Sequence, residues 1–118
     1  MKKKILVIDD DPDLVDVLKV RLEGGGYAVA TAFDGKEGLL KLPVEKPDLI
    51  IVDVMMPNMD GFSFVQEIKR TDGFSQTPII VLTGKELMGG IFKGEGIKDY
   101  LLKPVDGEQL LATIRKHI

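Results

Sequence analysis

Three aspartates and one lysine follow short apolar runs of the chain, where they could do chemistry together. Asp9 and Asp10 come directly after one apolar run, and Asp53 ends a second. Lys103 follows a third. Carboxylates held close together raise one another's pKa unless a positive charge compensates them. The available compensation is Lys103 and a divalent cation, and oxygen ligands with open water positions suit Mg²⁺ better than zinc or copper.

A carboxylate beside Mg²⁺, with a lysine and a threonine in reach, is suited to phosphoryl transfer. Carboxylates accept phosphoryl groups and form aspartyl phosphates. The transfer requires positioning and neutralisation of the phosphoryl oxygens more than covalent help from the protein. One oxygen could bind Mg²⁺, one the ammonium of Lys103 and one the hydroxyl of Thr83. Thr83 ends an apolar run between Asp53 and Lys103 in chain order, which favours this role over that of a plain strand residue.

The elements that must position these residues alternate along the chain, which predicts an α/β fold. Strands are expected over residues 5–8, 27–32, 49–53, 79–83 and 100–102, and helices over 12–23, 34–42, 61–70, 85–97 and 107–118. Five strands alternating with five helices imply a parallel sheet covered on both faces. Open sheets of this kind bind ligands at the carboxyl ends of their strands, so the acidic residues and the lysine should meet at that edge.

Aspartates mark the starts of several expected helices. Asp11 stands before Pro12, which predicts an N-cap followed by a proline in the first turn. Asp34 with Glu37 is a capping-box pattern, and Asp106 caps the last helix. The fourth helix is the exception, because five glycines crowd residues 84–96. Each interior glycine costs a helix roughly 0.5–1 kcal/mol relative to alanine, so we expect this helix to be short or irregular.

Composition narrows the classes of function. A chain of 118 residues suits one compact domain, which we place at residues 1–118. The net charge of −3 argues against direct binding of nucleic acid, and the absence of cysteine excludes disulfides and thiolate chemistry. No segment reaches transmembrane length, so no membrane association and a cytoplasmic location are expected. The single histidine, His117, is expected to be solvated or to lie at the end of the last helix.

Four motifs together resemble the receiver domain of bacterial two-component response regulators. They are Ile-Asp-Asp at 8–10, Asp-Val-Met-Met-Pro-Asn-Met-Asp-Gly at 53–61, Leu-Thr-Gly at 82–84 and Asp-Tyr-Leu-Leu-Lys-Pro at 99–104. Each motif alone is weak, but their order and spacing along the whole chain are very specific. The resemblance implies a flavodoxin-like doubly wound sheet with the strand order 2-1-3-4-5.

The resemblance also implies a role for each residue of the site. Asp53 would be the phosphoacceptor, taking a phosphoryl group from a sensor histidine kinase or a phosphotransfer protein. Asp10, Asp53 and the backbone carbonyl of Met55 would bind Mg²⁺ directly, and Asp9 would assist through water. The residues implied for phosphoryl binding and switching are Thr83, Lys103, Gly84 and Tyr100, and the peptide bond between Lys103 and Pro104 would be cis.

The output of such a domain is a change of surface on phosphorylation. The output domain or protein cannot be named from the sequence, and a phosphorylation-dependent homodimer stays open as one form of output. The chain would catalyse only its own phosphorylation and dephosphorylation, and so is not expected to be an enzyme acting on other substrates.

Other classes of protein fit the residues less well. A Mg²⁺-dependent phosphatase with an aspartyl nucleophile typically carries a second aspartate two residues later, where this chain has Met55. A flavin-binding module on the same fold would need a phosphate-binding loop after the first strand, where residues 9–11 are all aspartate. A receiver-like scaffold that binds proteins without being phosphorylated is the remaining alternative, and the intact acidic set speaks against it.

Overall fold

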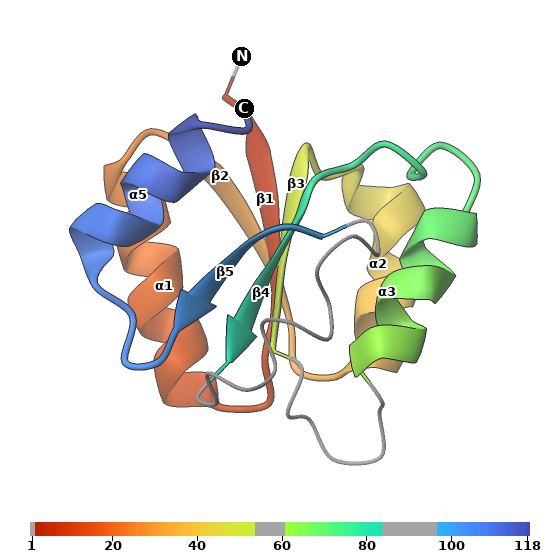
Figure 1. Ribbon diagram of the computed structural model, residues 1–118, viewed down its shortest axis with the longest axis horizontal. Helices are drawn as coiled ribbons and strands as arrows, with labels where there is room; N and C mark the ends of the chain where they lie inside the picture. The colour runs from red at the N-terminus through yellow and green to blue at the C-terminus, as the bar shows by residue number, and fades with distance from the viewer. Residues whose placement is uncertain (1, 54–60, 84–96) are drawn as a thin grey trace.

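The computed structural model describes residues 2–53, 61–83 and 97–118, which fold around one parallel sheet (Figure 1). In order across the sheet the strands are β2 (Ala28–Ala32), β1 (Lys4–Ile8), β3 (Leu49–Asp53), β4 (Ile79–Thr83) and β5 (Ile97–Leu102). Every neighbouring pair is parallel. This arrangement confirms the predicted doubly wound sheet and its strand order.

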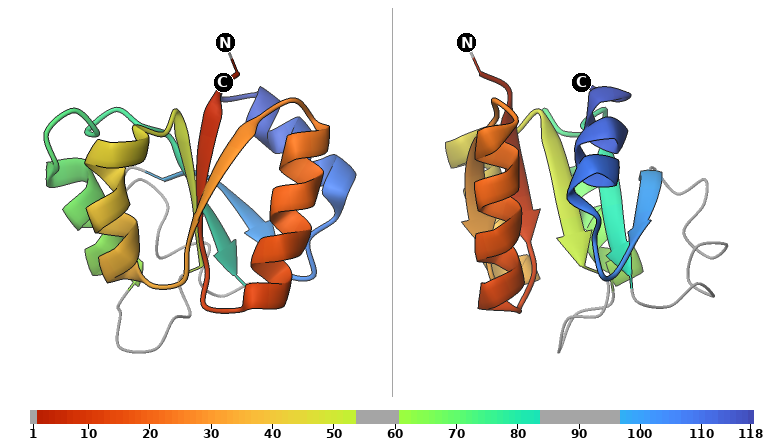
Figure 2. Two further views of the ribbon diagram at one scale, coloured as in Figure 1. Left: turned by 180° about the vertical axis from the view of Figure 1, so that it is seen from behind. Right: turned by 90° about the vertical axis from the view of Figure 1, so that its left-hand side faces the viewer.

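Four helices within the described residues cover the two faces of the sheet. Helices α1 (Pro12–Gly24) and α5 (Gly107–Arg115) lie on one face, and α2 (Gly35–Glu45) and α3 (Gly61–Arg70) lie on the other (Figure 2, left). The predicted fourth helix, with its short or irregular form, lies outside the described residues. In the part of the chain that the structure describes, every helix is too short or too polar to cross a membrane.

Alternate side chains of the buried strands enter two apolar layers, one on each face. Along β1, Ile5 and Val7 join the layer beneath α1 and α5, while Leu6 and Ile8 join the layer beneath α2 and α3. All four side chains are fully buried, and each contributes about 1.5–3 kcal/mol relative to an exposed position. The two layers therefore hold the strands, and the residues at their ends, in fixed register.

Helix α2 lies very close to the sheet at Gly38. A Cβ atom at this position would lie 2.6 Å from Cδ1 of Ile8 and 3.4 Å from Cζ of Phe64. Both neighbours are fully buried, so they have little room to move. The absence of a side chain at Gly38 is what allows the helix to sit against β1.

The end of α2 differs from the prediction. The helix was expected to stop at Leu42, before Pro43, but it continues to Glu45. Proline removes one backbone donor, yet the amide of Lys46 still donates to the carbonyl of Leu42 at 2.9 Å and closes the final turn. A proline this close to a helix end therefore does not terminate it.

Other boundaries also shift. β2 begins at Ala28 instead of Tyr27, whose amide donates to the carbonyl of Leu22 at the end of α1 and not to a strand. β5 begins at Ile97, because Ile97 pairs with Ile79 of β4 before an irregularity in the register. α5 ends at Arg115 instead of continuing to residue 118.

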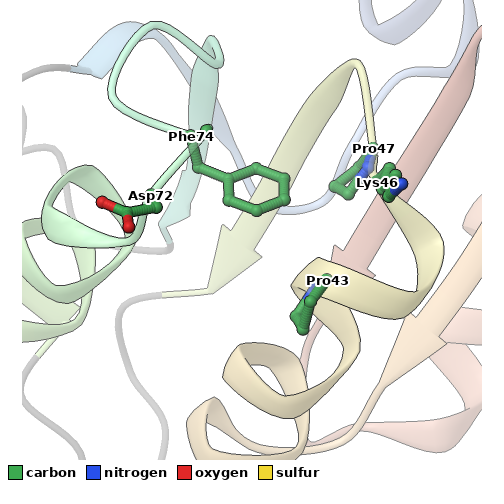
Figure 3. A pocket seen from close by; sticks show the side chains of 6 residues that line it. Pro43, Lys46, Pro47, Asp72 and Phe74 are labelled. Atoms are coloured by element: carbon green, nitrogen blue, oxygen red, sulfur yellow. The ribbon is translucent and has the colours of Figure 1, made fainter.

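A shallow hollow of about 340 Å³ opens at the amino-terminal edge of the sheet (Figure 3). Pro47 stands before β3 and Phe74 before β4, so the hollow faces away from the carboxyl end of β3, where Asp53 lies. Its lining is Pro43, Lys46, Pro47, Asp72, Gly73 and Phe74. It is therefore separate from the acidic residues predicted to carry the chemistry.

Candidate functional site

The predicted aspartates meet at the carboxyl ends of the two central strands. Asp53 is the last residue of β3, and Asp9 and Asp10 follow β1. Because Ile8 pairs with Val52, Asp9 and Asp53 continue neighbouring strands at the same level. Asp9 and Asp53 are buried, whereas Asp10 is exposed. The sheet thus brings two buried carboxylates and one exposed carboxylate to a single edge.

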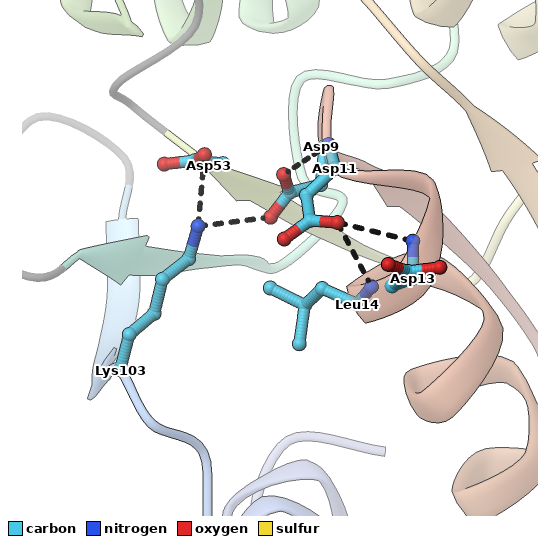
Figure 4. A network of polar contacts seen from close by, with 6 residues as sticks. All are labelled: Asp9, Asp11, Asp13, Leu14, Asp53 and Lys103. Carbon is cyan, nitrogen blue, oxygen red and sulfur yellow. Dashed lines mark hydrogen bonds and ion pairs between the residues drawn. The ribbon is translucent and has the colours of Figure 1, made fainter.

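Lys103 extends from the end of β5 to the two buried carboxylates (Figure 4). Its Nζ donates to Oδ2 of Asp53 at 3.0 Å and forms an ion pair with Oδ2 of Asp9 at 3.2 Å. The contact with Asp9 lacks hydrogen-bond geometry, so within the described residues Oδ2 of Asp9 is a buried oxygen with an ionic neighbour but no donor. The peptide bond between Lys103 and Pro104 is cis.

The three carboxylates have the chemistry of a site for a hard divalent cation. One oxygen from each of Asp9, Asp10 and Asp53 lies within 4.8 Å of the others. Oxygens on opposite sides of Mg²⁺ lie about 4.2 Å apart at its usual bond length. A small contraction of the three aspartates would therefore bring their oxygens to the spacing of Mg²⁺ ligands. The buried Oδ2 of Asp9, which lacks a donor, also fits this role. These residues therefore suit Mg²⁺.

The electrostatics of the site reflect two negative charges around one positive charge. Burial raises the pKa of the Asp9 carboxyl above its usual value; the hydrogen bond from the Asp11 amide opposes this shift and the charge of Asp53 adds to it. Burial alone would lower the pKa of Lys103, but its hydrogen bond and charge interaction with Asp53, with a contribution from Asp9, raise it. Lys103 is therefore held firmly in its charged form beside the carboxylates.

Asp11 contributes to the site through its backbone, a contact that the sequence pattern does not predict. Its amide donates to Oδ1 of Asp9 at 3.0 Å. Its side chain is the N-cap of α1, as predicted, and accepts from the amides of Asp13 and Leu14. The sequence pattern predicts the cap, but the direction of the Asp11 amide depends on the turn that links β1 to α1.

The remaining predicted residues fall into two groups. Thr83 is the last residue of β4 and pairs with Leu102 of β5; its side chain, Met55 and Gly84 lie outside the described residues. Tyr100 is on β5, half-buried, and packs against the apolar layer beneath α2 and α3. Its hydroxyl is buried without a hydrogen-bond partner among the described residues, and burial raises its pKa. Tyr100 thus points inward here.

His117 follows the end of α5 and contacts β5. Its Nε2 lies 3.3 Å from Oδ2 of Asp99, and Nζ of Lys116 lies 3.2 Å from the same oxygen. The other oxygen of Asp99 accepts from the amide of Tyr100 at 3.0 Å. The histidine is thus helix-terminal, as one of the two predicted alternatives had it, and it has no part in the acidic site.

An open parallel sheet with the strand order 2-1-3-4-5 defines the flavodoxin-like class of α/β proteins, and the acidic cluster lies at its switch point, between β1 and β3. Within that class, residues 5–115 match the family described as the response regulator receiver domain. The chain belongs to this family. Receiver domains are not a classical enzyme family, and they act in two-component signalling.

Relatives support this membership over the whole chain. The DNA-binding dual master transcriptional regulator RpaA of Synechocystis sp. is 39% identical over 114 residues, which is 95% of this chain and 47% of that protein. The chemotaxis protein CheY4 of Vibrio cholerae is 34% identical, with a TM-score of 0.93 and full coverage of both chains. The chain therefore spans about half the length of curated relatives such as RpaA.

One solved structure concerns the cation. The receiver domain of the sensor histidine kinase PA1611 from Pseudomonas aeruginosa is 28% identical, covers 99% of this chain and 98% of its own, and has a TM-score of 0.89. It is described with a magnesium ion coordinated in its active site cleft. This chain therefore has three clustered aspartates and shares its fold with a relative whose structure contains magnesium.

Proposed function

We propose that residues 1–118 form a single receiver domain that works as a phosphorylation-controlled switch, with Asp53 as the phosphoacceptor. The observation that carries the proposal is the position of Lys103, whose Nζ lies 3.0 Å from Asp53 and 3.2 Å from Asp9. Asp53 is buried at a strand end and is held beside a permanent cation. A carboxylate in this position can attack phosphorus, and a phosphoryl group bound to it would remain within reach of the ammonium.

The chemistry assigned to the chain's own groups is an in-line displacement. An oxygen of Asp53 forms the new bond to phosphorus while the bond to the donor's leaving atom, the nitrogen of a phosphohistidine or the oxygen of a small phosphodonor, breaks. Lys103 neutralises one phosphoryl oxygen, and we assign a second to the hydroxyl of Thr83. Bound Mg²⁺ supplies further neutralisation of charge. We assign its direct binding to Asp10, Asp53 and the carbonyl of Met55, with Asp9 assisting through water.

The readout is assigned to β5 and its surroundings. Tyr100 and Lys103 stand on the same strand and its exit, so a movement at the phosphoryl site reaches the tyrosine through a short, continuous backbone segment. We assign Tyr100 the role of the aromatic switch residue, with Gly84 leaving access to the phosphoryl group. The physiological donor is a sensor histidine kinase or a phosphotransfer protein. The domain acts in the cytoplasm, turns over no external substrate, and passes its state to an output domain or protein or to a second copy of itself.

The test is incubation with acetyl phosphate, with and without Mg²⁺, followed by mass spectrometry of the intact protein. We expect the mass of one added phosphoryl group only when Mg²⁺ is present, and no such gain in Asp53→Asn. Asp48→Asn is the matched control, because Asp48 is an exposed aspartate that accepts a hydrogen bond from the Lys4 amide, away from the site. An adduct that survives Asp53→Asn, or that forms equally without Mg²⁺, would refute the proposal.

A further inference from the structure

The carboxylate of Asp9 has one oxygen committed to the backbone and one turned toward the acidic cluster. The amide of Asp11 donates to Oδ1 at 3.0 Å, while Oδ2 lies 3.2 Å from Nζ of Lys103 (Figure 4). The amide of Asp9 is itself anchored, because it donates to the carbonyl of Ala32 at 3.1 Å. Asp9 is fully buried, so these contacts, and not solvent, decide which oxygen faces the cluster.

The side chain of Asp11 fixes the amide that makes this contact. Its Oδ1 accepts from the amides of Asp13 at 3.0 Å and Leu14 at 3.3 Å. With Pro12 next in the chain, this capping holds Asp11 in an extended conformation at φ −94° and ψ 105°. The turn between β1 and α1 is thus braced from the helix side by the cap, and the Asp11 amide is aimed at Asp9.

We propose that Asp11 is a positioning residue for the divalent cation site, acting through Asp9 and not by contact with the cation. Its cap aims the Asp11 amide, the amide holds Oδ1 of Asp9, and Oδ2 is thereby directed at Asp53 and Lys103. Groups that orient metal ligands from behind influence affinity strongly. The inference rests on the Mg²⁺ site of the proposed function.

The experiment compares Asp11→Ala, Asp11→Asn and Asp34→Ala. Asparagine caps helices as well as aspartate does, so Asp11→Asn keeps the geometry and removes the charge. Asp34→Ala removes the corresponding cap of α2, where Asp34 accepts from the Glu37 amide at 2.7 Å, and leaves the turn at Asp9 untouched. Two quantities are measured: the Mg²⁺ dissociation constant by titration calorimetry, and the ¹³Cγ resonance of Asp9 in the metal-free protein.

We expect Asp11→Ala to weaken Mg²⁺ binding about tenfold and to shift the Asp9 resonance. Asp11→Asn should restore both, and Asp34→Ala should match the wild type in both although it too has lost a cap. Wild-type affinity with an unshifted resonance in Asp11→Ala would overturn the proposal. Equal losses in the alanine and asparagine variants would also overturn it, because they would show that the charge of Asp11 acts and not its cap.

The outcome separates this inference from the proposed function. If the wild type binds Mg²⁺ with the expected ranking of variants but forms no aspartyl phosphate, the phosphoacceptor assignment fails and the role of Asp11 stands. If phosphorylation proceeds but Asp11→Ala binds Mg²⁺ normally, the role of Asp11 fails alone. A wild type that binds no Mg²⁺ would overturn both.

Discussion

Replacement of Lys103 by methionine tests whether the lysine and Mg²⁺ compensate the same charges. The ammonium lies 3.0 Å from an oxygen of Asp53 and 3.2 Å from one of Asp9. Each attraction amounts to about 5 kcal/mol at an effective dielectric constant of about 20, before the cost of desolvation is subtracted. Removal of one partner from a buried ion pair costs about 3–5 kcal/mol. Because the Lys103 side chain is 28% exposed and solvent screens it, we expect Lys103→Met to lower the free energy of unfolding by about 2–3 kcal/mol.

Magnesium should return a large part of this loss. The methionine variant removes a cation that contacts both Asp9 and Asp53, so a bound Mg²⁺ gains more there than in the wild type. We expect saturating Mg²⁺ to recover about half of the deficit, or about 1.4 kcal/mol, which corresponds to a roughly tenfold tighter dissociation constant. The assay is urea unfolding followed by circular dichroism at several Mg²⁺ concentrations, with a direct binding titration for each protein.

Lys69→Met is the control for loss of a half-buried lysine. Nζ of Lys69 donates to the carbonyl of Thr77, and burial lowers the pKa of this lysine. Its replacement should change stability by the same amount at every Mg²⁺ concentration. A deficit in Lys103→Met that is equally independent of Mg²⁺ would refute the reasoning, because the lysine would then be stabilising the fold by some means other than compensation of the carboxylates.

Three further substitutions probe the packing and the contacts of the residues after α5 with β5. Asp99→Asn should cost about 1 kcal/mol at neutral pH, since the partly exposed carboxylate loses its ion pair with Lys116 and its contact with His117. Burial would raise the pKa of Asp99, but hydrogen bonds from Tyr100, His117 and Lys116 lower it. The stability difference between Asp99→Asn and the wild type should therefore be full above pH about 4 and vanish as the pH falls through that lowered pKa. Unfolding at neutral and acidic pH measures this difference, and growth of the difference on acidification would contradict the prediction. Gly38→Ala should destabilise the protein by about 1–3 kcal/mol, because its Cβ would lie 2.6 Å from Cδ1 of Ile8. Gly24→Ala, whose Cβ would meet nothing within 4 Å, should instead stabilise the protein by about 0.5–1 kcal/mol. Thermal unfolding measures both changes.

The sheet and its acidic edge could be predicted from the sequence because they depend on local patterns of apolar and charged residues. The apolar residues before Asp53 predicted a strand buried on both faces, and all of Leu49–Asp53 is buried. The alternation of strands and helices predicted parallel strands, and parallel strands bring their carboxyl ends to one edge. Lys103 was predicted to compensate the aspartates, together with a divalent cation, because it too follows a strand, and its Nζ lies 3.2 Å from Asp9 and 3.0 Å from Asp53.

Features that depend on particular backbone and side-chain contacts could not be predicted. The continuation of α2 past Pro43 depends on the Lys46 amide finding the Leu42 carbonyl, which no propensity encodes. The start of β5 at Ile97 depends on pairing with β4, since Ile97, Lys98 and Asp99 lack an apolar run of their own. The contact of His117 with Asp99 joins the chain end to an edge strand, a meeting that only the packed structure determines.

Because Asp9 is fully buried, stability favours a neutral side chain at this position, whereas cation binding requires a carboxylate there. Among the described residues Asp9 and Asp53 share Lys103 as a charged partner, and a neutral residue at position 9 would remove one buried carboxylate from a water-poor site. Directed evolution that selects only for heat resistance should therefore replace this aspartate early, with asparagine as the substitution that keeps the acceptor for the Asp11 amide. Aspartate should be retained at position 9 only if cation binding is selected at the same time. The residue found at position 9 after such an experiment therefore shows whether cation binding was under selection.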